Sequence, residues 1–106
     1  MSQKEVITLI KEYILLLKQM GIPVEKAYLY GSYARNEATA TSDIDLLLIS
    51  DLFDTRDDYI LSSPWKYTTK IDHRIEPIAV GSKKFQTDYV SPIIQIVRKE
   101  GIEIVL

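Results

Sequence analysis

The sequence predicts an α/β domain in which a small mixed β-sheet has helices packed against it. Three observations predict this class. An amphipathic pattern over residues 3–20 indicates a helix, the continuously apolar segment 46–49 is typical of a central strand covered on both faces, and Ser91-Pro92 is a helix start. A length of 106 residues is that of one domain, so we expect a single domain over residues 1–106.

The composition excludes several classes of protein. Hydrophobic residues make up 46% of the chain and charged residues 26%, which favours a globular protein over a disordered one. The absence of cysteine excludes disulfides, thiolate metal sites and cysteine nucleophiles. A net charge of −2 without a long basic block argues against binding to extended nucleic acid. No apolar run is long enough to span a membrane and the first residues lack a signal pattern, so we expect a cytoplasmic protein.

The first helix is expected from about Gln3 to Met20. Ser2 and Glu5 have the spacing of a capping box, and Gly21 ends the helix. Its apolar residues recur every three or four positions and predict one buried stripe, made by Val6, Leu9, Ile10, Tyr13, Leu16, Leu17 and Met20. This helix is interpreted as scaffold.

The rest of the chain predicts strands and helices in alternation. We expect strands at 26–30, at 43–50 and at 71–80, where Pro77 favours an edge position, and a short strand within 102–106. Residues 51–70 are interpreted as a loop and a helix interrupted by Pro64. In the last helix, closed by Gly101, the expected buried residues are Ile93, Ile94, Ile96 and Val97.

The chemistry-bearing residues lie between the first two predicted strands. Asp43 and Asp45 are two positions apart, so in an extended segment both carboxylates point to one face, where they repel each other unless a cation lies between them. Gly31-Ser32 begins a turn whose backbone N–H groups and hydroxyl are suited to a phosphate, and it lacks the lysine of a Walker-type loop. Adjacent strands would bring the turn and the carboxylates to the same end of a sheet.

The pattern Gly31-Ser32, ten residues, Asp43-Ile44-Asp45 resembles the minimal nucleotidyltransferase family of the DNA polymerase β-like superfamily. The resemblance implies a nucleotidyltransferase fold in which Gly31 and Ser32 contact the triphosphate of a nucleotide and Asp43 and Asp45 bind Mg²⁺. One departure is Asn36, where the family commonly has glycine.

The resemblance also implies a third carboxylate on a later strand. Glu76 matches that context best and Asp72 is the alternative, although the family's usual residue is Asp rather than Glu. If the strand over 71–80 is regular, Asp72, Arg74 and Glu76 share one face, so that Asp72 would support the site and Arg74 would contact phosphate or substrate.

The activity implied by the resemblance is transfer of a nucleoside monophosphate, AMP from ATP, to a hydroxyl acceptor with two Mg²⁺ ions. Arg35 is a candidate triphosphate contact, with a surface salt bridge as the alternative. The acceptor surface is expected from a second polypeptide, either another copy of this chain or a helical protein, and the resemblance implies a HEPN-type toxin modified on a tyrosine. The alternatives are a non-catalytic nucleotide- or partner-binding module of the same fold, and a cation-binding protein without nucleotide.

Overall fold

The computed structural model describes all residues from 1 to 106 and is built on a four-stranded mixed sheet. Its strand order is β3-β2-β1-β4, with bounds β1 (Lys26–Tyr30), β2 (Ile44–Ser50), β3 (Ile75–Gly81) and β4 (Ile102–Glu103). β1 runs antiparallel to β2 and to β4, whereas β2 and β3 are parallel. The predicted class, a small mixed sheet with helices, is confirmed.

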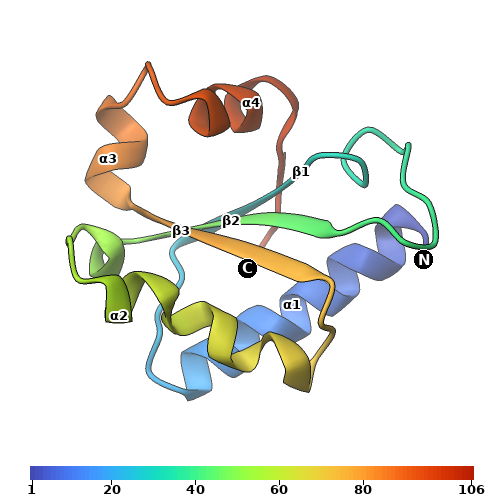
Figure 1. Cartoon of the computed structure of the whole chain (residues 1–106), viewed down its shortest axis with the longest axis horizontal. Coiled ribbons are helices and arrows are strands. Elements are labelled where there is room, and N and C mark those ends of the chain that lie inside the picture. Colours follow the sequence, from blue (N-terminus) through green and yellow to red (C-terminus); the bar gives the residue numbers. More distant parts are fainter.

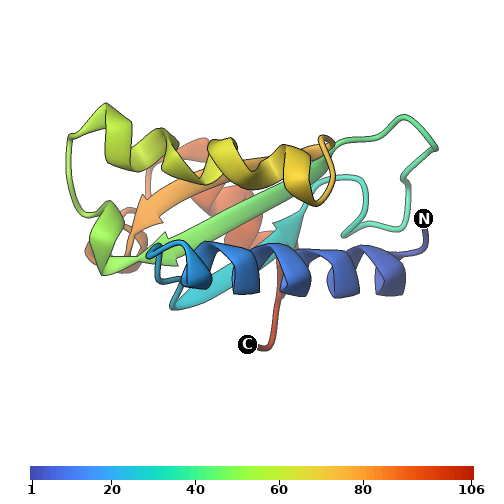
Figure 2. The same ribbon diagram turned by 90° about the horizontal axis from the view of Figure 1, so that it is seen from below.

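Helices cover both faces of the sheet and make three layers (Figure 1). One face carries α1 (Gln3–Gln19), α2 (Asp58–Ser62) and the 3₁₀ helix η2 (Ser63–Lys70), and Figure 2 shows α1 beside the α2–η2 segment. The other face carries α3 (Ser82–Thr87) and α4 (Pro92–Glu100). A short 3₁₀ turn, η1 (Asp51–Phe53), follows β2.

The protein has two hydrophobic cores, one on each face of the sheet, and β2 contributes side chains to both. This explains the continuous apolar sequence of β2. Leu46 and Leu48 pack into the core under α1, and Leu47 and Ile49 pack into the smaller core under α4. Alternate residues of a strand point to opposite faces, so a strand with helices on both sides needs apolar residues throughout. The predicted central strand is confirmed, although it begins at Ile44 rather than at residue 43.

The predicted start and end of α1 are confirmed. The Ser2 hydroxyl accepts the Glu5 N–H at 3.1 Å and the Glu5 carboxylate accepts the Ser2 N–H at 2.9 Å. The buried stripe is Val6, Ile10, Tyr13, Ile14 and Leu17. Met20 was wrongly included in the stripe: it lies past the last turn and is 48% exposed. Leu9 and Leu16 are only partly buried.

Two further predictions are corrected near the end of the chain. Ile96 is 45% exposed, because in α4 only Ile94 and Val97 point fully into the core. Ser91 does not cap α4 with its side chain; its hydroxyl donates to the Asp88 carboxylate at 2.6 Å.

The third strand begins at Ile75, four residues later than predicted. The Asp72 carboxylate accepts the N–H of Arg74 at 2.9 Å and turns the chain before the strand begins. Asp72 and Arg74 are therefore not strand neighbours of Glu76, and that prediction is wrong. The edge position expected from Pro77 is confirmed, since β3 is the outermost strand next to β2. No helix is both long enough and apolar enough to cross a membrane.

Candidate active site

A row of polar side chains crosses three strands near one end of the sheet. Asp45 of β2 is paired with Glu76 of β3 on one side and with Tyr30 of β1 on the other. Directly paired residues of neighbouring strands point to the same face, so all three share the face that carries α3 and α4. Asp43 lies one residue before β2 and is exposed, while Asp45 and Glu76 are half-buried. The structure thus brings the predicted carboxylates together.

Burial and neighbouring charges raise the pKa values of Asp45, Glu76 and Tyr30. Burial is the largest cause of the raised pKa of Asp45, followed by the charge of Asp43, and Arg35 acts in the opposite direction. The pKa of Glu76 is also raised, first by burial and then by the charges of Asp43 and Asp45. Burial, followed by the charges of Asp45 and Glu76, raises the pKa of Tyr30 to about 12. A site with this much uncompensated negative charge favours a bound cation.

Mg²⁺ is the ion that the resemblance implies for this donor set. Carboxylate oxygens are the ligands that this hard cation prefers, so the chemistry of the three side chains fits. However, no group of three or more His, Asp or Glu side chains in the structure lies at metal-holding spacing. Asp43, Asp45 and Glu76 are therefore neighbours that are coupled through their charges, and their side chains would have to move to hold one ion.

The turn after β1 approaches the carboxylate row closely. Gly31 has φ +78, and a Cβ atom at this position would lie 2.1 Å from the Asp45 Oδ2 atom. Glycine meets both conditions without strain, because most other residues avoid positive φ and an added Cβ atom would force the Asp45 side chain to move. The turn is closed by bonds from the Arg35 N–H to the Gly31 carbonyl, at 3.2 Å, and from the Glu37 N–H to the Ser32 carbonyl, at 2.9 Å. The backbone N–H groups of Ser32 and Tyr33 donate to no backbone carbonyl.

Asn36 ends this turn with φ +56. Among residues with a side chain, asparagine tolerates this left-handed conformation best, and glycine tolerates it at no steric cost. The departure from the commoner glycine therefore preserves the backbone geometry of the turn.

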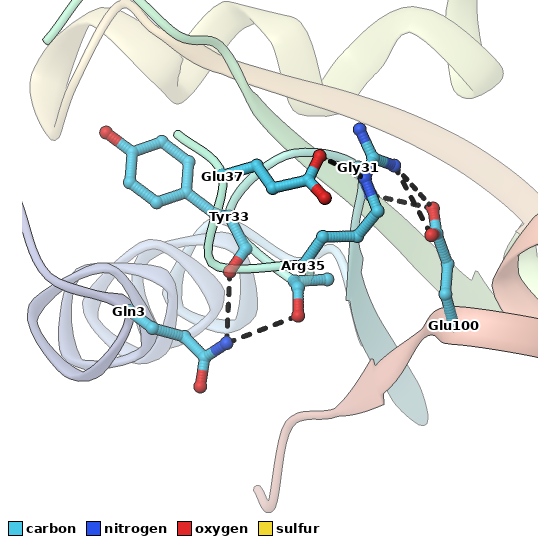
Figure 3. A network of polar contacts seen from close by, with 7 residues as sticks. Gln3, Gly31, Tyr33, Arg35, Glu37 and Glu100 are labelled. Atoms are coloured by element: carbon cyan, nitrogen blue, oxygen red, sulfur yellow. Dashed lines mark hydrogen bonds and ion pairs between the residues drawn. The ribbon is translucent and has the colours of Figure 1, made fainter. Parts of the chain in front are cut away.

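Arg35 reaches across the turn to two carboxylates (Figure 3). Its Nε atom lies 3.2 Å from Glu37, and its Nη1 atom lies 3.1 Å from the Oε1 atom of Glu100 at the end of α4. The same Glu100 oxygen accepts the Gly31 N–H at 3.3 Å. Gln3 of α1 donates to the Tyr33 carbonyl at 3.0 Å and holds the turn from the other side. Sequence reasoning missed Glu100, because it lies far along the chain in an ordinary helical pattern.

The alternative third carboxylate lies outside this row. Asp72 is bound by the guanidinium of Arg74, with Nη2 to Oδ2 at 2.7 Å and Nε to Oδ1 at 3.0 Å. The hydrogen bond from the Arg74 side chain is the largest of the causes that lower the pKa of Asp72 to about 2. Arg74 is therefore paired with Asp72, and of the two candidates only Glu76 is paired in register with Asp45.

The sequence is similar to known proteins. The family model described as "Nucleotidyltransferase domain" matches residues 10–105. The chain is 34% identical over 82 residues to a Methanocaldococcus jannaschii protein named "Putative protein adenylyltransferase", a match that covers 76% of this chain and 82% of that protein.

Solved structures show the same fold. A crystal structure named as a putative nucleotidyltransferase from Sulfolobus solfataricus superposes with a TM-score of 0.66 at 19% identity, over 95% of this chain and 80% of that one. A toxin–antitoxin crystallised with AMP-PNP gives 0.58 at 20% identity, over 99% of this chain and 73% of that one. A mutant of the toxin–antitoxin MntA–HpeT gives 0.54 at 18% identity, with the same coverage.

Proposed function

The chain belongs to the nucleotidyltransferase domain family, and on that premise we propose that it is an Mg²⁺-dependent enzyme that transfers AMP from ATP to a hydroxyl acceptor. The observation that carries the proposal is the row in which Asp45 is paired with Glu76 and touches the Gly31 turn. This arrangement puts a phosphate-binding turn and acidic groups at the same end of the sheet, as phosphoryl transfer requires.

The residues divide into two sets. Asp43, Asp45 and Glu76 would hold Mg²⁺, which when bound neutralises charge on the phosphates and favours deprotonation of the acceptor hydroxyl. Free backbone N–H groups of the turn, the Ser32 hydroxyl and Arg35 would bind and orient the triphosphate.

The transfer forms one bond and breaks one. The acceptor oxygen attacks the α-phosphorus, the bond from that phosphorus to the bridging oxygen breaks, and pyrophosphate leaves. Glu76 takes the proton of the acceptor hydroxyl. Its carboxylate is paired in register with Asp45, at the end of the sheet where the turn would hold the triphosphate.

The proposed acceptor is a tyrosine hydroxyl of a separate helical, HEPN-type protein, so that the chain would act as an antitoxin. Two comparisons support this choice. The M. jannaschii relative is named as a protein adenylyltransferase, and two of the similar structures are toxin–antitoxin complexes, one of them with AMP-PNP. Transfer to a second copy of this chain is the other outcome that the assay below distinguishes.

The test is incubation with Mg²⁺, α-labelled ATP and, where the adjacent gene encodes a helical protein, that protein. We expect label on that protein with the wild type and with Asp72→Asn, and a loss of at least about a hundredfold with Asp45→Asn or Glu76→Gln. Asp72→Asn is the matched control, since it also removes a carboxylate near β3. Equal labelling by all variants, or labelling that depends on Asp72 and not on Glu76, would refute the proposed roles.

The second candidate is a non-catalytic module that binds nucleotide or partner. The absence of a preformed three-ligand metal site favours it. It predicts tight partner binding that Asp45→Asn leaves unchanged, and no label transfer at any Mg²⁺ concentration.

A further inference from the structure

Glu100 places a carboxylate against two donors of the turn that follows β1. Its Oε1 atom accepts from the Gly31 N–H at 3.3 Å and from Arg35 Nη1 at 3.1 Å, and its Oε2 atom lies 3.3 Å from the same nitrogen. We call the Gly31 N–H and the Arg35 guanidinium together the anion site. Figure 3 shows the Glu100 side chain reaching both groups from the end of α4.

The surroundings make this carboxylate a poor permanent occupant. Asp43, Asp45 and Glu76 lie in the neighbouring row, and Glu37 also contacts Arg35. The Glu100 carboxylate therefore adds a further negative charge to a part of the molecule that is already rich in carboxylates.

A phosphate group of a nucleotide would need the same donors. A backbone N–H points in one direction and cannot donate well to two anions at once. The Glu100 side chain is 23% exposed and is therefore accessible to solvent. Glu100 is the last residue of α4, just before Gly101. A change of side-chain rotamer would release the anion site without unfolding the helix.

We propose that Glu100 takes the position that a phosphate group would occupy in the nucleotide-bound protein, and that the nucleotide must displace it in order to bind. The proposal rests on the nucleotide-binding function proposed above. It makes Glu100 a residue that sets nucleotide affinity rather than a catalytic residue: it keeps Arg35 directed at the anion site while weakening the binding of the substrate.

The test compares Glu100→Gln with Glu103→Gln, using MgATP and inorganic tripolyphosphate as separate probes in calorimetric titrations. Glu103 is a matched control because it is three residues away on β4 and contacts Tyr28, with the Tyr28 hydroxyl donating at 3.2 Å. We expect Glu100→Gln to bind both probes about two- to fivefold more tightly, the effect of removing a partly exposed charge pair. Glu103→Gln should bind as the wild type does.

If Glu100 only stabilises the turn, Glu100→Gln should bind the probes more weakly than the wild type, because loss of its hydrogen bonds would disorder the turn. Unchanged or weaker binding by Glu100→Gln, while the wild type binds both probes, would overturn the inference and leave the proposed function standing. If the wild type binds neither probe, both the inference and the proposed function fail.

A measurement on the wild type guards against a variant that does not fold. In an NMR titration with tripolyphosphate, the Gly31 amide and the Glu100 carboxyl carbon should shift together at the same ligand concentrations. A Gly31 shift with an unmoved Glu100 carboxyl would show that the anion binds without displacing it, and would overturn the inference.

Discussion

Replacing Gly31 with alanine separates backbone strain from contact with the site, because the chain offers a matched control. Gly31 has φ +78 and Gly21 has φ +84, so alanine at either position meets the same left-handed backbone. The added Cβ atom at Gly21 has no neighbour within 4 Å, whereas at Gly31 it would lie 2.1 Å from Asp45 Oδ2 and 3.0 Å from Asp45 Cγ. The two variants differ only in the demand placed on Asp45.

The magnitudes follow from that difference. Positive φ costs alanine roughly 1–2 kcal/mol, so both variants should lose about that much free energy of unfolding. At Gly31 the Asp45 side chain must also leave its rotamer, which adds about 0.5–1.5 kcal/mol. Each kcal/mol should lower Tm by roughly 4–8 °C for a domain of this size. The larger effect is functional, since the displaced carboxylate is one of the predicted Mg²⁺ ligands.

The assay combines urea denaturation with the labelled-ATP transfer reaction. Gly21→Ala should be destabilised and fully active in the folded state, and Gly31→Ala should be destabilised slightly more and lose most of its transfer activity. If Gly31→Ala transfers AMP as well as Gly21→Ala does, the approach of the turn to Asp45 has no role in the reaction and the reasoning is wrong.

Three further predictions concern the same surroundings. Asn36→Ala should lower the free energy of unfolding by about 1 kcal/mol in urea titrations, whereas Asn36→Gly should be near neutral, because position 36 has positive φ. The pKa of Asp72 is lowered to about 2, so its pairing with Arg74 stabilises the folded protein at pH values above the unfolded pKa. This stabilisation is lost as the pH falls from about 4 to 2. Asp72→Asn should therefore reduce the fall in the free energy of unfolding over that pH range. Tyr30 should ionise near pH 12 in an ultraviolet titration, and Asp45→Asn should lower that pKa, since the charge of Asp45 is a cause of the shift second to burial. An unchanged Tyr30 titration in that variant would contradict the contact.

The parts of the structure that sequence could predict depend on local patterns. The capping box of Ser2 and Glu5, the central strand around Leu47 and the edge position of Pro77 each follow from a rule that needs only neighbouring residues. The Gly31-Ser32 and Asp43-Asp45 spacing likewise predicted a turn beside two carboxylates, which the structure brings together.

The parts that sequence could not predict depend on distant contacts. Glu100 contacts Gly31 only because α4 crosses the face that carries the carboxylate row, and no local pattern records that crossing. The late start of β3 was missed because the Arg74 N–H donates to the Asp72 carboxylate. This hydrogen bond forms a local turn where the sequence pattern predicts a strand. Helical spacing alone likewise did not show that α4 would leave Ile96 exposed.

The edge position of β3 also bears on how another chain could pair with the sheet beside Glu76. Pro77 lies next to Glu76 in the outermost strand and has no N–H group, and a proline in an edge strand turns its nitrogen to the open side. That edge cannot offer a complete row of donors to an added strand, which protects it from pairing with a second sheet. Addition of a strand at this edge is therefore disfavoured, and a protein that docks there should do so through side chains, as a helical surface can.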